Sequence, residues 1–107
     1  MDAAKPKVSN AFQVFMSEAS GHAKAWNEMV IKLDQCSALD KKTEEIAYLA
    51  VLAALRMESG VPFHVKTAKL AGATREEIVS AVLVGLPAAG HVVTQVLPTA
   101  LQAFDED

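Results

Sequence analysis

Two side chains suited to proton transfer, Glu45 and His64, lie on either side of a predicted helix break. Glu45 begins a long apolar run, and His64 follows the break at residues 59–62, Ser-Gly-Val-Pro. If the two flanking helices are neighbours, the carboxylate and the imidazole can form an acid/base pair. Burial would move the proton affinity of each group toward neutral pH, where general acid/base catalysis is efficient. A structural alternative stays open, in which Glu45 favours a helix N-terminus and His64 is a hydrogen-bonded core histidine.

Two further side chains are candidates for substrate binding. Arg56 could clamp a carboxylate, or it could be a cation that the dipole of a helix C-terminus favours. Along an ideal helix it would lie about 16 Å from Glu45. His91 could face the same cavity as His64 or lie in a subunit interface. No histidine or carboxylate pair has metal-ligand spacing on one helix face, so the sequence predicts no metal and no cofactor.

The chain has a single cysteine, Cys36, which excludes an intrachain disulfide and is typical of a reducing compartment. We therefore expect a cytoplasmic protein. Its formal net charge is −3 and its lysines are scattered, which argues against nucleic acid as a partner. No apolar window reaches the roughly 18 residues of a membrane span, and residues 1–7 lack the apolar core of a signal peptide.

Alanine dominates the apolar residues, which favours helices throughout and predicts one all-α domain over residues 1–107. About six helices are expected. The first three run from Ser9 to a stop at Gly21, around Trp26 to before Cys36, and from the cap Asp40 through 46–55. The last three run from Pro62 to Gly72, from the capping box of Thr74 and Glu77 to Gly85, and over 88–104 with a bend at Pro98. The run 46–55, IAYLAVLAAL, has no polar face and is expected to be buried on all sides, partly against another subunit. The chain is 51% hydrophobic, more than a monomer of this length hides, which also predicts oligomers.

Three sequence features together resemble the carboxymuconolactone decarboxylase superfamily, which includes the alkylhydroperoxidase D proteins. They are Leu39-Asp40 with Thr-Glu-Glu-Ile at 43–46, the histidine at position 64, and Ala-Gly-Ala-Thr-Arg-Glu-Glu-Ile at 71–78. The resemblance covers about residues 39–103. It implies an alkylhydroperoxidase D-like helical bundle in which a helical hairpin packs against its copy. The implied partner is therefore the chain itself, in intertwined homodimers, trimers or hexamers.

The thiol-dependent branch of that family has the pattern E-x11-C-x-x-C-x-x-x-H. Glu45 and His64 match its Glu and His, whereas Met57 and Gly60 stand at its two cysteine positions. A thioether can neither be deprotonated nor form a disulfide, so peroxiredoxin-type activity is disfavoured. Cys36 lies at a position that the pattern does not use.

The decarboxylase branch keeps the Glu and the His without the cysteines. The leading interpretation is therefore thiol-independent acid/base chemistry on a small carboxylated or lactone-type substrate. Glu45 and His64 would be catalytic, and Arg56 and His91 would bind the substrate. The alternatives are alkylhydroperoxidase activity and a non-catalytic ligand-binding or assembly protein.

Overall fold

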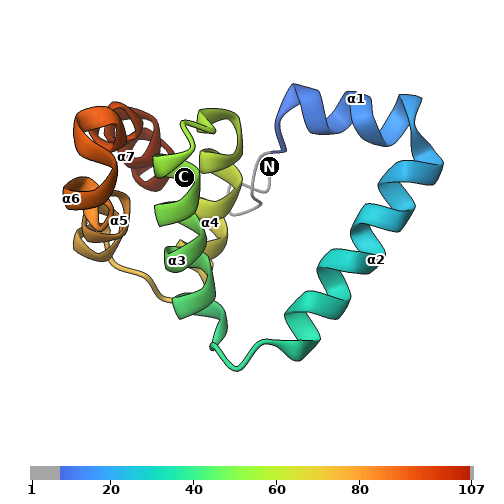
Figure 1. The fold of residues 1–107 in the computed structure, drawn as a ribbon, viewed down its shortest axis with the longest axis horizontal. Helices are drawn as coiled ribbons and strands as arrows, with labels where there is room; N and C mark the ends of the chain where they lie inside the picture. The colour runs from blue at the N-terminus through green and yellow to red at the C-terminus, as the bar shows by residue number, and fades with distance from the viewer. Residues whose placement is uncertain (1–7, 107) are drawn as a thin grey trace.

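A computed structural model describes residues 8–106, which fold into helices joined by short turns (Figure 1). The elements are α1 (Asn10–Glu18), α2 (Ser20–Cys36), α3 (Lys41–Ala54), η1 (Glu58–Gly60), α4 (Val61–Leu70), α5 (Arg75–Leu83), α6 (Leu86–Ala89), η2 (Gly90–Val96) and α7 (Leu97–Asp105), where η marks a 3₁₀ helix. The all-α prediction is confirmed. The number of helices differs slightly from six, because the last predicted helix is divided at Gly90 into α6, η2 and α7.

The described residues form a helical body, α3 to α7, and an arm, α1 and α2, that stands away from it (Figure 1). Nearly all buried apolar side chains belong to the body, where α3 packs against α4, α5 and η2, and α4 packs against α7. Its largest fully buried side chains are Leu49, Val61, Val65, Ile78, Val82, Val93 and Val96. The arm contributes only Ala23 to the buried set. The main core is therefore complete without the arm.

Local signals begin and end the two helices that carry Glu45 and His64. The Asp40 side chain caps α3 by accepting a hydrogen bond of 2.8 Å from the Thr43 backbone N–H. At the C-terminal end of α3 the Met57 backbone N–H donates a hydrogen bond of 2.9 Å to the Leu52 carbonyl. Arg56, between them, adopts the left-handed conformation (φ 60°) that ends many helices. Pro62 then lies in the first turn of α4, where its fixed φ suits a helix start.

One expectation about a helix end is wrong, and one about burial is met only in part within a single chain. Gly21 does not stop the first helix, because the break falls at Ala19 (φ −136°) and Gly21 lies inside α2. The run 46–55 was expected to be buried partly against another subunit, and within this one chain it is buried on the side that faces the body, so its full burial stays a prediction. Val51 is 54% and Leu55 61% exposed, because this side of α3 faces the arm or solvent rather than the body.

Residues 75–105 form a helical stretch that is long and apolar enough, by length and composition only, to cross a membrane. Such a stretch is weak evidence for a span, because core helices of soluble proteins pass the same test. Here it bends at Gly90 (φ 82°), so that α7 packs against α5. Its side chains Ile78, Val82 and Val93 are fully buried in the core of the body, and 17% of its most apolar window is buried.

Polar contacts attach the end of α7 to the rest of the body. The Lys69 Nζ donates to the Phe104 carbonyl at 2.6 Å, and the Lys66 Nζ donates to the Glu106 carbonyl. Arg75, at the start of α5, donates to both carboxylate oxygens of Asp105, at 2.9 and 3.1 Å. These hydrogen bonds from Arg75 hold the pKa of Asp105 below its ordinary value.

The lowered pKa of Asp105 predicts a loss of stability in acid. A carboxylate with a pKa lower in the folded than in the unfolded state stabilises the fold above its unfolded pKa. That contribution is lost as the pH falls through the folded pKa. We expect the free energy of unfolding, measured by urea denaturation, to decrease as the pH falls from about 5 to about 2, with a smaller decrease in Asp105→Asn. Arg75→Gln should flatten the pH dependence in the same way, and an unchanged slope in both variants would contradict this account.

Candidate functional site

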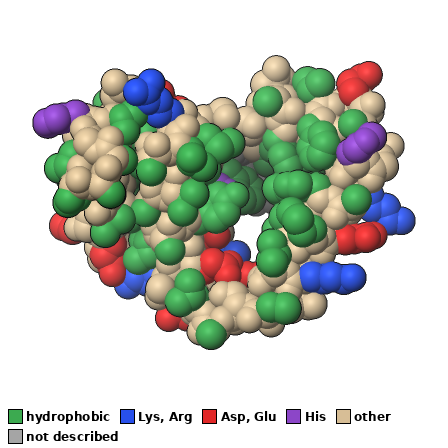
Figure 2. Space-filling view, in the orientation of Figure 1, with side chains coloured by type: hydrophobic (Ala, Val, Ile, Leu, Met, Phe, Trp, Pro, Cys, Tyr) green, Lys and Arg blue, Asp and Glu red, His purple; other side chains and the backbone are tan. Residues whose placement is uncertain are grey.

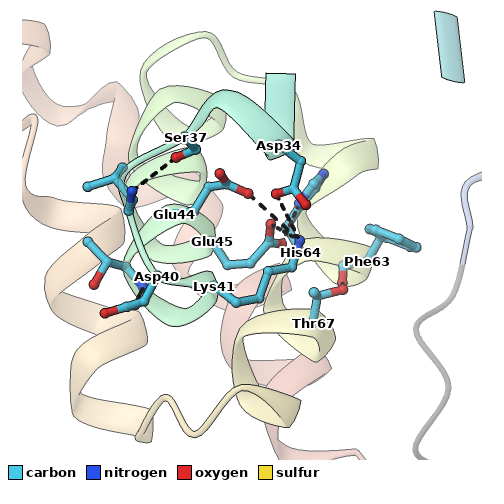
Figure 3. A network of polar contacts seen from close by, with 11 residues as sticks. Asp34, Ser37, Asp40, Lys41, Glu44, Glu45, Phe63, His64 and Thr67 are labelled. Atoms are coloured by element: carbon cyan, nitrogen blue, oxygen red, sulfur yellow. Dashed lines mark hydrogen bonds and ion pairs between the residues drawn. The ribbon is translucent and has the colours of Figure 1, made fainter. Parts of the chain in front are cut away.

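The structure brings Glu45 and His64 into direct contact. The His64 Nδ1 lies 2.8 Å from the Glu45 Oε1, which is a hydrogen bond between α4 and α3 (Figure 3). Glu45 is only 4% exposed, while the His64 side chain keeps 21% of its surface accessible. The carboxylate is therefore enclosed, and the imidazole is the member of the pair that reaches accessible space.

Neighbouring side chains fix the imidazole ring and the second carboxylate oxygen. Tyr48 stacks on His64 with ring centroids 4.2 Å apart, and Phe63 meets the same ring edge-on at 5.1 Å. The Lys41 Nζ lies 3.6 Å from the Glu45 Oε2. The ring is thus held on two sides, and the carboxylate lies between an imidazole and an ammonium group.

The same ammonium group connects the arm to the body. The Lys41 Nζ lies 3.8 Å from a Glu44 oxygen and 4.0 Å from a carboxylate oxygen of Asp34, near the end of α2 (Figure 3). Three carboxylates from α2 and α3 therefore surround one lysine. This polar cluster forms one end of the space between the arm and the body.

That space is a cleft of about 840 Å³ with His64 in its wall. Figure 2 shows the hollow, with hydrophobic side chains on both its arm side and its body side. Its lining residues come from the following parts of the chain: Val8, Ser9 and Phe12; Trp26, Asn27, Met29, Val30, Ile31, Leu33 and Asp34 of α2; Ser37 and Leu39; Lys41, Glu44, Glu45, Ala47, Tyr48 and Val51 of α3; Ser59 and Gly60; and Phe63, His64 and Thr67 of α4. This volume suits a small organic molecule.

The structure does not bring the other predicted site residues into this cleft. Arg56 is exposed at the end of α3, and His91 is exposed at the start of η2, and neither belongs to the lining. Their proposed substrate contacts stay predictions without support from this geometry. Cys36 is an exposed free cysteine at the end of α2, also outside the lining.

Of the two positions that carry cysteines in the related pattern, which a backbone hydrogen bond of 3.2 Å joins, only one lines the cleft. Gly60 lines the cleft, whereas Met57 is 50% exposed and lies outside it. Within residues 8–106, no group of three or more His, Cys, Asp and Glu side chains is placed to hold a metal ion. The chemically equipped part of the cleft is therefore the Glu45–His64 pair with its polar cluster.

Lys41, Tyr48 and Asp34 were not predicted from the sequence to lie beside this pair. Lys41 and Tyr48 lie four residues before and three residues after Glu45, so helical spacing alone places all three on one face of α3. This signal was available in the sequence. Asp34 belongs to the arm, and no local pattern indicates that α2 returns its last turn to the start of α3.

Comparisons with known proteins agree with this fold. The model of the carboxymuconolactone decarboxylase family matches residues 21–106, most of the chain, and the protein therefore belongs to this family. The structure is also similar to the ligand-free crystal structure of a carboxymuconolactone decarboxylase family protein from Legionella pneumophila. The two share 25% sequence identity and a TM-score of 0.76, over 89% of this chain and 85% of the other. Among curated proteins, none matches this sequence.

The contact between Glu45 and His64 predicts strong energetic coupling. Removing the imidazole in His64→Ala leaves a buried carboxylate without this partner, which costs about 1–3 kcal/mol of folding stability. In a double-mutant cycle with Glu45→Ala, urea denaturation should give a coupling energy of about 0.5–3 kcal/mol.

A matched cycle on an exposed contact serves as the control. The Thr99 hydroxyl donates to Glu58 at 3.3 Å on the surface of the protein. Replacing either residue by alanine there should change stability by no more than about 0.5 kcal/mol. Equal coupling energies in the two cycles would contradict a special role for the buried pair.

Proposed function

We propose that this family member catalyses thiol-independent acid/base chemistry on a small carbonyl or lactone-type molecule held in the cleft. The observation that carries the proposal is the 2.8 Å contact between an enclosed carboxylate and an imidazole in the wall of an apolar cleft. This arrangement resembles the orienting carboxylate and histidine of known acid/base sites.

The contact assigns different tasks to the two nitrogens of His64. With Glu45 ionised, the Nδ1–H donates to the Glu45 Oε1, and the Nε2 carries the lone pair that can accept a proton. When the Nε2 accepts a proton, the ring becomes an imidazolium, and the neighbouring Glu45 carboxylate stabilises that positive charge. His64 can then return the proton to another atom of the same substrate. Such a step moves a proton and a double bond, with no net change in oxidation state.

The residues available argue against a dithiol peroxidase. Met57 and Gly60 replace the nucleophile and its partner, and the exposed Cys36 lies outside the cleft. Reduction of a peroxide needs a thiolate that becomes a disulfide or a sulfenic acid. The chain has a single thiol, so it cannot close an intrachain disulfide.

The proposal predicts that His64→Ala lowers turnover by about 100-fold or more, because the proton acceptor is lost. The assay follows isomerisation of a β,γ-unsaturated butenolide to its α,β-unsaturated isomer by ultraviolet absorbance, with and without a carboxylate on the ring. His22→Ala, which removes an exposed histidine outside the cleft, is the matched control, and Cys36→Ser should also keep full activity. Turnover unchanged in His64→Ala, or peroxide reduction that survives Cys36→Ser, would overturn the proposal.

We also propose that a second copy of the chain covers the exposed apolar side chains of α2 and α3. The chain exposes 6891 Å², whereas a compact monomer of 11.4 kDa should expose about 5,800 Å². The chain therefore exposes about 1,100 Å² more than expected, which exceeds the roughly 800 Å² that each partner buries in a stable complex. Large apolar residues such as Ile31 and Leu33, 56% and 62% exposed, would supply the contact, and because both also line the cleft, the second copy would form part of the cleft wall.

Leu33→Glu tests this partner, because a charge in a buried apolar contact costs free energy on association. Analytical ultracentrifugation should show an oligomer for the unaltered chain and a smaller species for Leu33→Glu. The neighbouring Lys32→Glu introduces the same side chain at a position outside the cleft and should keep the oligomer. A monomer in the unaltered protein would contradict this proposal and leave the acid/base proposal untouched.

A further inference from the structure

We propose that Tyr48 is a positioning residue for His64, because its ring fixes the plane of the imidazole and with it the direction of the Nε2 lone pair. This inference rests on the proposed acid/base function and deepens it by adding a residue that orients the proton acceptor. It uses contacts within one chain only, so it does not depend on what covers the exposed side chains of α2 and α3.

The hydrogen bond between His64 and Glu45 fixes one atom of the imidazole and leaves the ring plane undetermined. The Nδ1 lies 2.8 Å from the Glu45 Oε1, so the position of that nitrogen is set. The terminal torsion of a histidine side chain has only a broad preference, so rotamer preference alone does not set the plane. Tilting the ring while this hydrogen bond is kept redirects the Nε2 lone pair. A second contact must therefore determine where the Nε2 points.

Tyr48 supplies the contact that determines the plane. Its ring stacks on the imidazole with the centroids 4.2 Å apart and the planes 26° from parallel. Phe63 meets the imidazole edge-on, with a centroid distance of 5.1 Å and an angle of 75°, so it does not lie along a ring face. Stacked and edge-on arrangements are the ones that aromatic rings prefer. Because a stack is lost when either ring tilts, the Tyr48 contact opposes the motion that the hydrogen bond allows.

Both contacts with His64 come from one face of α3. Glu45 and Tyr48 are three residues apart in this helix, which places their side chains next to each other on its surface. His64 lies in the first turn of α4, directly after Pro62. The carboxylate and the phenol ring therefore hold the imidazole from a helix, and geometry built on helices is more precise than geometry built on loops.

The exposure of Tyr48 separates this role from a role in the core. Tyr48 is 44% exposed, so its replacement should change the free energy of unfolding little. Other side chains of the same helix, such as Leu49 and Leu52, are buried in the core of the body. A change in the behaviour of His64 after replacement of Tyr48 then reports on the ring contact and not on the packing of the core.

Replacing the ring tests the inference in the complete chain. Tyr48→Leu should lower kcat for the butenolide isomerisation at least about ten-fold and change KM less than about three-fold, because the proton acceptor is misdirected while the substrate still binds. Tyr48→Phe keeps the ring without the hydroxyl, so its kcat should stay within about two-fold of the unaltered value. Phe15→Leu is the matched control, because it removes a ring that contacts Trp26 at 6.5 Å but lies outside the cleft lining, and it should keep kcat.

A measurement without turnover separates this inference from the proposed reaction. Nuclear magnetic resonance relaxation gives the order parameter of the imidazole C–H bonds, and His64→Ala identifies the signals of this ring. We expect an order parameter of about 0.85 in the unaltered chain, in Tyr48→Phe and in Phe15→Leu, and a value below about 0.6 in Tyr48→Leu. The imidazole protons should also be shifted upfield by the stacked ring in the unaltered chain and in Tyr48→Phe.

An unchanged kcat in Tyr48→Leu overturns the inference, as does an unchanged order parameter. An equal loss of kcat in Tyr48→Phe and Tyr48→Leu also overturns it, because the hydroxyl and not the ring would then matter. If the unaltered chain does not isomerise the butenolide, the proposed reaction fails, and the order parameter decides whether Tyr48 positions His64. Tyr48→Met takes the place of Tyr48→Leu if analytical ultracentrifugation shows that the leucine variant has lost the fold or the oligomer.

Discussion

The hydrogen bond between Glu45 and His64 is the constraint on which the rest of this structure depends. An ionised carboxylate that is 4% exposed needs a partner, because burial without one costs several kcal/mol. The partner comes from a different helix, so α3 and α4 must pack at one distance and one rotation. The Asp40 cap, the turn around Arg56 and Pro62 set where these helices begin and end. The contacts of α7 with α4 then hold the second helix in place.

The cleft follows from how the buried surface is distributed. The body completes its core without α2, so the arm meets the body through a polar cluster at Lys41 and leaves apolar side chains on both sides of the space. The chain belongs to the carboxymuconolactone decarboxylase family, and the Glu45–His64 contact lies in the wall of this cleft. At the cysteine positions of the thiol-dependent pattern, Gly60 contributes only backbone to the cleft wall and Met57 lies outside it. The structure thus has the carboxylate–imidazole contact in the cleft wall and no thiol at either of these two positions.

Predictions from the sequence succeeded where a local rule operates and failed where long-range packing decides. The cap at Asp40, the capping box at Thr74 and the start at Pro62 are local hydrogen-bond or backbone rules, and the structure has all three. Gly21 was misassigned as a helix stop, because a glycine is tolerated inside a helix when the break lies nearby, here at Ala19. The run 46–55 was expected to be buried partly against the body and partly against another subunit, but composition cannot tell which face meets which, and the structure shows only the face toward the body.

The sequence by itself determined the helical class and the family, and it singled out Glu45 and His64 as a candidate pair. Propensity, capping and motif spacing are all encoded within short stretches of chain. Only the tertiary structure decided that Glu45 and His64 meet at 2.8 Å, that Asp34 of the arm lies 4.0 Å from Lys41, and that Arg56 and His91 lie outside the cleft. These outcomes depend on the packing angle between helices and on the return of the arm through Asp34. Such relations arise from contacts between distant segments, which no local pattern records.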